Sequence, residues 1–119
     1  MFLGSVECNF SEPTGAPCLG AVGQMLIFHL PSTANTSIRL RKDSKEIVLK
    51  TSKDKTVTFH GEFVNQTELF TNGTWKLGTA TKRHSGNYTL EEFGYAGDCV
   101  KKVTVQLEIK GKFWIFFSK

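Results

Sequence analysis

Apolar and polar residues alternate with a period of two along several short segments of this chain. Leu26, Phe28 and Leu30 are separated by Ile27 and His29, and the segment 102–109 alternates lysine, threonine, glutamine and glutamate with valine, leucine and isoleucine. This alternation is typical of strands that bury one face and expose the other. Clusters of Gly, Pro, Asn, Asp and Ser between these segments predict turns. The pattern predicts strands near 4–10, 18–23, 24–30, 37–42, 46–51, 56–59, 62–69, 74–79, 86–93 and 100–109, which indicates an all-β sandwich or barrel.

Composition restricts the domain organisation and the partners. With 119 residues, the chain is expected to form one domain around a small core. The formal net charge is +4, but Lys and Arg are interleaved with Asp and Glu, so no nucleic-acid site is expected. The apolar stretches 25–30 and 113–117 fall far short of the about 20 residues of a membrane helix. Membrane attachment is therefore expected only through parts of the gene outside this chain.

The asparagines indicate a secretory route. All five stand in the Asn-X-Ser/Thr pattern of N-glycosylation, with no Pro at the middle position. Ordinary Ser and Thr usage would place roughly one Asn in six in this pattern, so five accidental matches in polar turns are the weaker interpretation. We therefore expect an extracellular domain, at the cell surface or secreted, with glycans at Asn9, Asn35, Asn65, Asn72 and Asn87.

The segment 84–90, His-Ser-Gly-Asn-Tyr-Thr-Leu, narrows the fold. Immunoglobulin domains carry a Tyr two residues before the second cysteine of their intersheet disulfide, and its hydroxyl bonds back to the preceding corner. Tyr88 fits this corner, but Leu90 stands in the place of that cysteine. Leu30 stands in the place of the first cysteine, and Leu40 in the place of the usual tryptophan. Apolar burial of these leucines would then replace the disulfide.

In lacking both cysteines, the chain resembles the membrane-distal V-type domains of a group of lymphocyte adhesion receptors. This group comprises the T-cell erythrocyte receptor and the signalling lymphocyte activation molecule (SLAM) family. The segments 19–24, 30–32 and 69–77 carry this resemblance, together with the unbroken spacing from Trp75 to Ile109. It implies an immunoglobulin-like V-type β-sandwich that lacks the intersheet disulfide. The sandwich would cover 18–110, with an N-terminal extension or first strand over 1–17 and a tail over 111–119.

Two positions depart from the family pattern. His84 replaces the Asp that usually precedes Ser-Gly, so the Arg–Asp ion pair of that corner is lost. Trp75 stands where the family often has a leucine, and we expect it to be buried with Leu30, Leu40 and Leu90.

The resemblance also implies where the protein binds. In this family one sheet, called the front sheet, meets a similar sheet of the partner, which is another immunoglobulin-superfamily protein on a cell surface or a second copy. An ordinary solvated strand face is the alternative, but Arg beside exposed aromatic residues is enriched at interfaces. Alternation and turn positions select Arg39, Arg41, Lys42, Lys45, Val48, Lys50, Thr89, Glu91, Phe93, Tyr95, Lys102 and Thr104 as the partner-binding residues.

The three cysteines allow one bridge. If the first strand runs in the same direction as the last, Cys8 lies at the height of Cys99, whereas Cys18 lies a strand length away. We therefore expect the pair Cys8–Cys99 in preference to Cys18–Cys99. A bridge between Cys8 and Cys18 would instead close the N-terminal stretch into a loop.

No catalytic constellation is visible in the sequence. The three histidines, His29, His60 and His84, fall on separate elements, and Glu91 and Glu92 point to opposite faces of one strand. We expect no enzyme activity, no metal and no cofactor. Adhesion or costimulation between immune cells is the leading hypothesis, and a secreted or pathogen-borne decoy that mimics such a receptor is the alternative. An enzyme or small-molecule carrier on this scaffold would require a buried polar pocket.

Overall fold

The computed structural model describes residues 4–11, 15–32, 36–52, 56–60, 68–70 and 72–111. The glycosylation sites expected at Asn35 and Asn65, residues 62–67 of the strand expected over 62–69 and residues 112–119 of the tail expected over 111–119 lie outside the described residues. The remaining strand predictions agree with the structure to within a few residues. The elements are β1 (Ser5–Asn9), β2 (Cys18–Ala21), β3 (Met25–His29), β4 (Ser37–Lys42), β5 (Glu46–Thr51), β6 (Val57–Phe59), β7 (Glu68–Leu69), β8 (Thr74–Thr79), the 3-10 helix η2 (Lys82–His84), β9 (Gly86–Phe93) and β10 (Cys99–Lys110).

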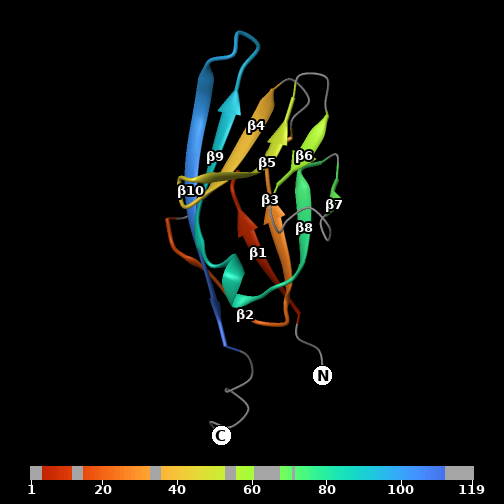
Figure 1. The fold of residues 1–119 in the computed structure, drawn as a ribbon, viewed down its shortest axis with the longest axis vertical. Coiled ribbons are helices and arrows are strands. Elements are labelled where there is room, and N and C mark those ends of the chain that lie inside the picture. Colours follow the sequence, from red (N-terminus) through yellow and green to blue (C-terminus); the bar gives the residue numbers. More distant parts are fainter. Residues whose placement is uncertain are drawn as a thin grey trace, which may run out of the picture.

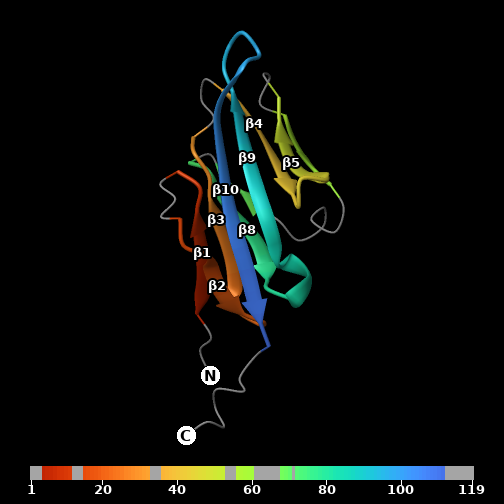
Figure 2. The ribbon, with the colours of Figure 1, turned by 90° about the vertical axis from the view of Figure 1, so that its left-hand side faces the viewer.

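The strands form two sheets that pack face to face (Figure 1). One sheet has four strands in the order β1-β3-β8-β7, and we call it the back sheet. The other has six strands in the order β2-β10-β9-β4-β5-β6, and we call it the front sheet. Neighbouring strands are antiparallel except at β1–β3 and at β2–β10, which are parallel. Figure 2 shows that the hairpin formed by β9 and β10 extends beyond the rest of the front sheet.

Aromatic rings fill the centre of the core between the sheets. The Phe28 ring lies 5.2 Å from Phe10, 5.6 Å from Trp75 and 5.0 Å from Tyr88, measured between ring centroids. Edge-to-face contacts of this kind add about 0.5–1.5 kcal/mol beyond area burial. These four rings are fully buried, so aromatic packing joins β3 and β8 of the back sheet to β9 of the front sheet.

The leucines expected to replace that disulfide are buried, as predicted. Leu30 is 4% exposed, Leu40 and Trp75 are 0% exposed, and Leu90 is 1% exposed. Leu40 and Leu90 are direct partners in the pairing of β4 with β9, so their side chains project to the same side of the front sheet. No cysteine lies on β3 or β9, and the core is held together there by apolar contacts alone.

Tyr88 forms the corner that the sequence predicted. Its hydroxyl donates a hydrogen bond of 2.5 Å to the carbonyl oxygen of His84, at the end of η2. His84 fastens the same corner from the other side, because its Nδ1 accepts a hydrogen bond of 2.9 Å from the backbone N–H of Thr81. Ser85 Oγ accepts a further bond from the backbone N–H of Ile109, at 2.9 Å. The corner is thus tied to β10 without an Arg–Asp ion pair.

The predicted bridge Cys8–Cys99 is wrong, because the first strand runs in the opposite direction to the one assumed. β1 is parallel to β3, so it runs against β10 and not with it. The chain then turns back, and Cys18 on β2 lies opposite Leu107. Leu107 is eight residues beyond Cys99 on β10, a rise of roughly 26 Å. Cys99 is therefore far from both other cysteines.

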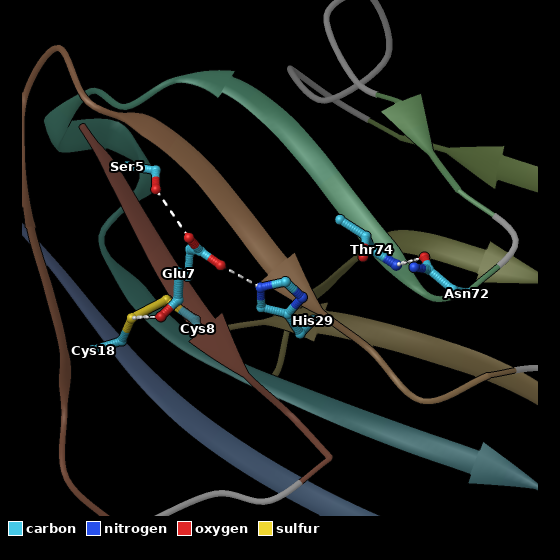
Figure 3. Close-up of polar contacts among 7 residues, drawn as sticks. All are labelled: Ser5, Glu7, Cys8, Cys18, His29, Asn72 and Thr74. Carbon is cyan, nitrogen blue, oxygen red and sulfur yellow. Dashed lines mark hydrogen bonds and ion pairs between the residues drawn. A yellow bond between two sulfur atoms is a disulfide. The ribbon is translucent and has the colours of Figure 1, made fainter. Parts of the chain in front are cut away.

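A disulfide joins Cys8 to Cys18 (Figure 3), with their Cα atoms 5.8 Å apart. It links β1 of the back sheet with β2 of the front sheet at one edge of the sandwich. Gly20 permits the close approach of these two strands, because a Cβ atom there would lie 2.8 Å from the side chain of Val6. Cys99 is free and exposed.

Candidate protein-binding surface

Four charged side chains form one row across the outer face of the front sheet. Arg39 on β4 pairs with Lys50 on β5 and with Glu91 on β9, and Glu91 pairs in turn with Lys102 on β10. Directly paired residues of antiparallel strands project to the same side. Strand alternation turns the flanking residues Leu40 and Leu90 into the core, so this row faces outward. It carries three cations and one carboxylate.

Glu91 holds the two arginines of the face in place. Its Oε1 lies 3.3 Å from Arg39 Nε and 3.2 Å from Arg41 Nε. The side chains of both arginines are 30% exposed and that of Glu91 is 18% exposed. Partly exposed pairs of this kind stabilise a fold by only about 0–1 kcal/mol. Their main effect is to fix the guanidinium groups against the sheet, where they are presented to solvent in a defined arrangement.

An aromatic ring completes this cluster. The Arg39 guanidinium carbon lies 4.7 Å from the centroid of the Phe93 ring, within the range of a cation–π interaction. Phe93 is half-buried and is the last residue of β9. We call Arg39, Arg41, Glu91 and Phe93 the arginine cluster. Arg and aromatic side chains are the residue types that most often dominate binding energy at protein interfaces.

The next row of paired residues, toward the β4–β5 turn, is more neutral. Arg41 pairs with Thr89 on β9, and Thr89 pairs with Thr104 on β10. The two threonine hydroxyl oxygens are 3.1 Å apart and hydrogen-bonded. Thr89 is only 8% exposed, so Thr104, which is exposed, presents the accessible part of this pair.

The prediction that Val48 faces outward is wrong. Leu40 pairs with Leu49, but Arg41 pairs with Ile47, so β5 contains one residue more than β4 at this point. This β-bulge interrupts the alternation, and Val48 turns into the core at 0% exposure. Ile47 takes its place on the outer face opposite Arg41. Three consecutive apolar residues, 47–49, were the signal in the sequence that alternation fails here.

The structure places the turn residues at opposite ends of the face. Lys42 and Lys45 flank the β4–β5 turn, where Asp43 and Ser44 have φ of 54° and 60°, which suits a tight hairpin. The Lys42 ammonium donates to the carbonyl of Arg83, so it is engaged within the domain, whereas Lys45 is exposed. At the other end, Tyr95 is 85% exposed in the β9–β10 turn and Val100 is 56% exposed beside it.

The three described glycosylation sites are all exposed, but their surroundings differ. Asn9 Oδ1 accepts a hydrogen bond of 2.8 Å from Ser11 N, and Asn72 Oδ1 accepts one of 3.0 Å from Thr74 N (Figure 3). Asn87 lies within β9, opposite Gln106 on β10, and its side chain projects from the outer face of the front sheet. A glycan at Asn87 would therefore stand at the lower end of the predicted binding face.

The histidines do not converge on a catalytic or metal site. His29 Nε2 lies 2.6 Å from Glu7 Oε1 on the back sheet (Figure 3), His84 fastens the Tyr88 corner, and His60 follows β6. The hydrogen bond from His29, and then that from Ser5, lower the pKa of the Glu7 carboxyl below its ordinary value. Within the described ranges, no group of three or more His, Cys, Asp and Glu side chains is arranged to hold a metal ion.

Comparison with known proteins shows the fold. No protein-family profile and no curated protein matches the chain. Among solved structures, the V domain of amphioxus IgVJ-C2 is 16% identical, with a TM-score of 0.60 over 77% of this chain and 98% of that one. The CD2-binding domain of CD58 (lymphocyte function-associated antigen 3) is 17% identical, with a TM-score of 0.59 over 87% of this chain and 53% of that one. Murine CEACAM1b is 15% identical, with a TM-score of 0.62 over 88% of this chain and 52% of that one.

The chain spans about half the length of the CD58 and CEACAM1b chains. Identities this low show the fold alone. The protein therefore has an immunoglobulin-like V-type β-sandwich, as the sequence predicted. In the part of the chain that the structure describes, there is no helix of the length and apolarity needed to cross a membrane.

Proposed function

We propose that this domain works outside the cell as a recognition module, and that it binds another protein through the outer face of its front sheet. The observation that carries this proposal is the arginine cluster. Glu91 and Phe93 hold two arginines in fixed, partly exposed positions on the outer face of the front sheet. A side chain that is already ordered loses less entropy when it meets a partner.

The charge of this face supports a choice of partner. Arg39, Arg41, Lys50 and Lys102 outnumber the carboxylates of the outer face, where Glu91 lies among them and the exposed Glu108 lies further along β10. The facing surface of the partner is therefore acidic, because opposite charges guide encounter and like charges across an interface cost several kcal/mol. Ile47, Phe93 and the exposed Tyr95 add apolar contact area to the same side of the sandwich.

The partner class follows from the kind of surface. An exposed sheet face can pack against a second sheet face, such as the front sheet of another immunoglobulin-superfamily domain. Among the structural neighbours, the fragment of CD58 is a CD2-binding domain, which shows that this sandwich is used for protein recognition in one protein of similar fold. We propose the same use here, as adhesion or costimulation between immune cells, with an immunoglobulin-superfamily protein as the partner.

A binding screen tests this function. The domain, secreted from cultured animal cells, is immobilised and exposed to a panel of immunoglobulin-superfamily ectodomains. We expect at least one partner whose affinity falls as salt is raised from about 0.1 to 1 M, where the Debye length shrinks from about 10 to 3 Å. A panel without any binder, or binding that salt leaves unchanged, would count against the proposal.

A further inference from the structure

A hollow of about 460 Å³ lies beside the front sheet, between the N-terminal strands and β10. It exists because β2 pairs only with residues 107–110 of β10. Above that point, residues 104–106 of β10 form one wall, residues 7–9 of β1 form another, and residues 15–18 lie across from them. The disulfide between Cys8 and Cys18 fixes the distance between the two N-terminal walls.

Two glycosylation sites border this hollow, one from each sheet. Asn9 comes from β1 of the back sheet, and Asn87 comes from β9 of the front sheet. The Asn9 side chain is already held by its hydrogen bond from Ser11 N. The Asn87 backbone is fixed by its bonds to Asp43, whereas its side-chain amide makes no hydrogen bond within the described part of the chain. Of these two asparagines, Asn87 is therefore the one whose backbone is fixed and whose side-chain amide makes no hydrogen bond within the described part of the chain.

We infer that Asn87 carries an N-glycan whose first sugars lie in this hollow. The lining suits a sugar ring, because the disulfide, Ala16 and Pro17 offer apolar surface while Gln106 offers a hydrogen-bonding amide. Mixed linings of this volume are typical of sites for small molecules. A glycan held there is directed across β10 toward β1 and away from the β4–β5 side of the front sheet.

The chemistry of attachment sets an order of events. Asn87 Nδ2 attacks the anomeric carbon of a lipid-diphosphate-linked oligosaccharide. The bond from that carbon to the diphosphate oxygen breaks, the lipid diphosphate leaves, and Nδ2 loses one proton. The transfer also requires the hydroxyl two residues on, and in the folded domain Thr89 is only 8% exposed and its Oγ1 is hydrogen-bonded to Thr104. Asn87 is therefore modified before β9 pairs with β10.

This inference has a consequence for binding that rests on the proposed function. The Asn87–Gln106 pair lies two residues below the Thr89–Thr104 pair and four below the pair formed by Glu91 and Lys102. A glycan at Asn87 covers the lower end of the face near β10. The partner then contacts the upper part, which comprises the arginine cluster and the exposed tip at Tyr95.

The experiment compares wild type with Asn87→Gln and, as a matched control, Asn72→Gln, all secreted from cultured animal cells. Glycopeptide mass spectrometry reports occupancy, and hydrogen–deuterium exchange reports protection of residues 15–18 and 104–107. We expect a glycan at Asn87, and faster exchange in both segments after Asn87→Gln but not after Asn72→Gln. If Asn87→Gln is not secreted, enzymatic removal of the glycan from folded wild type replaces it.

An unmodified Asn87 would overturn the inference. So would a glycan whose loss leaves exchange in both segments unchanged, because such a sugar does not lie in the hollow. Neither readout involves a partner protein, so these results stand apart from success or failure of the binding screen.

Discussion

Truncation of Leu90 tests whether apolar packing replaces the usual disulfide. Leu90 is 1% exposed, and its partners in the neighbouring strands are Leu40 and Val103. Leu90→Ala removes three carbon groups, a loss of roughly 2.4 kcal/mol at about 0.8 kcal/mol per group. Hydrogen-bonded strands on both sides limit collapse around the gap, so a cavity adds to this loss. We expect a fall of about 3–5 kcal/mol in the free energy of unfolding.

Urea unfolding followed by tryptophan fluorescence measures this change, since Trp75 is fully buried. Leu19→Ala serves as the control because Leu19 on β2 is 59% exposed, and its truncation should change stability by no more than about 0.5 kcal/mol. A loss below about 1 kcal/mol for Leu90→Ala, with an unchanged urea slope, would refute the reasoning. Equal losses in the two variants would do the same.

Two further predictions concern the N-terminal strands. Non-reducing peptide mapping should recover one peptide that joins Cys8 to Cys18, with Cys99 free to react with an alkylating reagent. Any bridge to Cys99 would contradict the structure. Cys8→Ala should lower the free energy of unfolding by about 2–3 kcal/mol. Because His29 lowers the Glu7 pKa, the ionised carboxylate stabilises the fold above its unfolded pKa, and this contribution is lost as pH falls through the lowered value. The Tm of wild type should therefore exceed that of Glu7→Gln near neutral pH, and this difference should vanish in acid. A difference that stays constant between about pH 6 and 2 would argue against a stabilising role of the ionised Glu7.

The sequence predicted local structure well, because alternation records which face of a strand is buried. It located the strands, the Tyr88 corner and the burial of Leu30, Leu40 and Leu90, which depend on spacing within one segment. The direction of β1 was not predictable in this way. An edge strand pairs either parallel or antiparallel with the same alternation, and the choice depends on contacts with β3 that are distant in sequence. The incorrect disulfide followed from that direction.

The binding face was only partly predictable. Residue parity brought Arg39, Arg41 and Glu91 to one face, but it does not show that Glu91 contacts both arginines or that Phe93 lies under Arg39. Those contacts depend on the register between β4 and β9. Val48 was misplaced because a bulge adds one residue to β5, and parity cannot be counted through a bulge.

The central claim is that the front sheet binds a partner, and charge reversal at Arg41 tests it most directly. Arg41→Glu is compared with Lys76→Glu, which reverses an exposed charge on β8 of the back sheet. Both proteins should fold, although Arg41→Glu loses its ion pair with Glu91 and melts somewhat below wild type, and their affinity for the partner found in the screen is measured at low and high salt. We expect Arg41→Glu to weaken binding at least tenfold, which is about 1.4 kcal/mol, with a smaller effect at high salt, and Lys76→Glu to bind like wild type. An affinity that Arg41→Glu leaves unchanged, in a normally folded protein, would contradict the front sheet as the binding site.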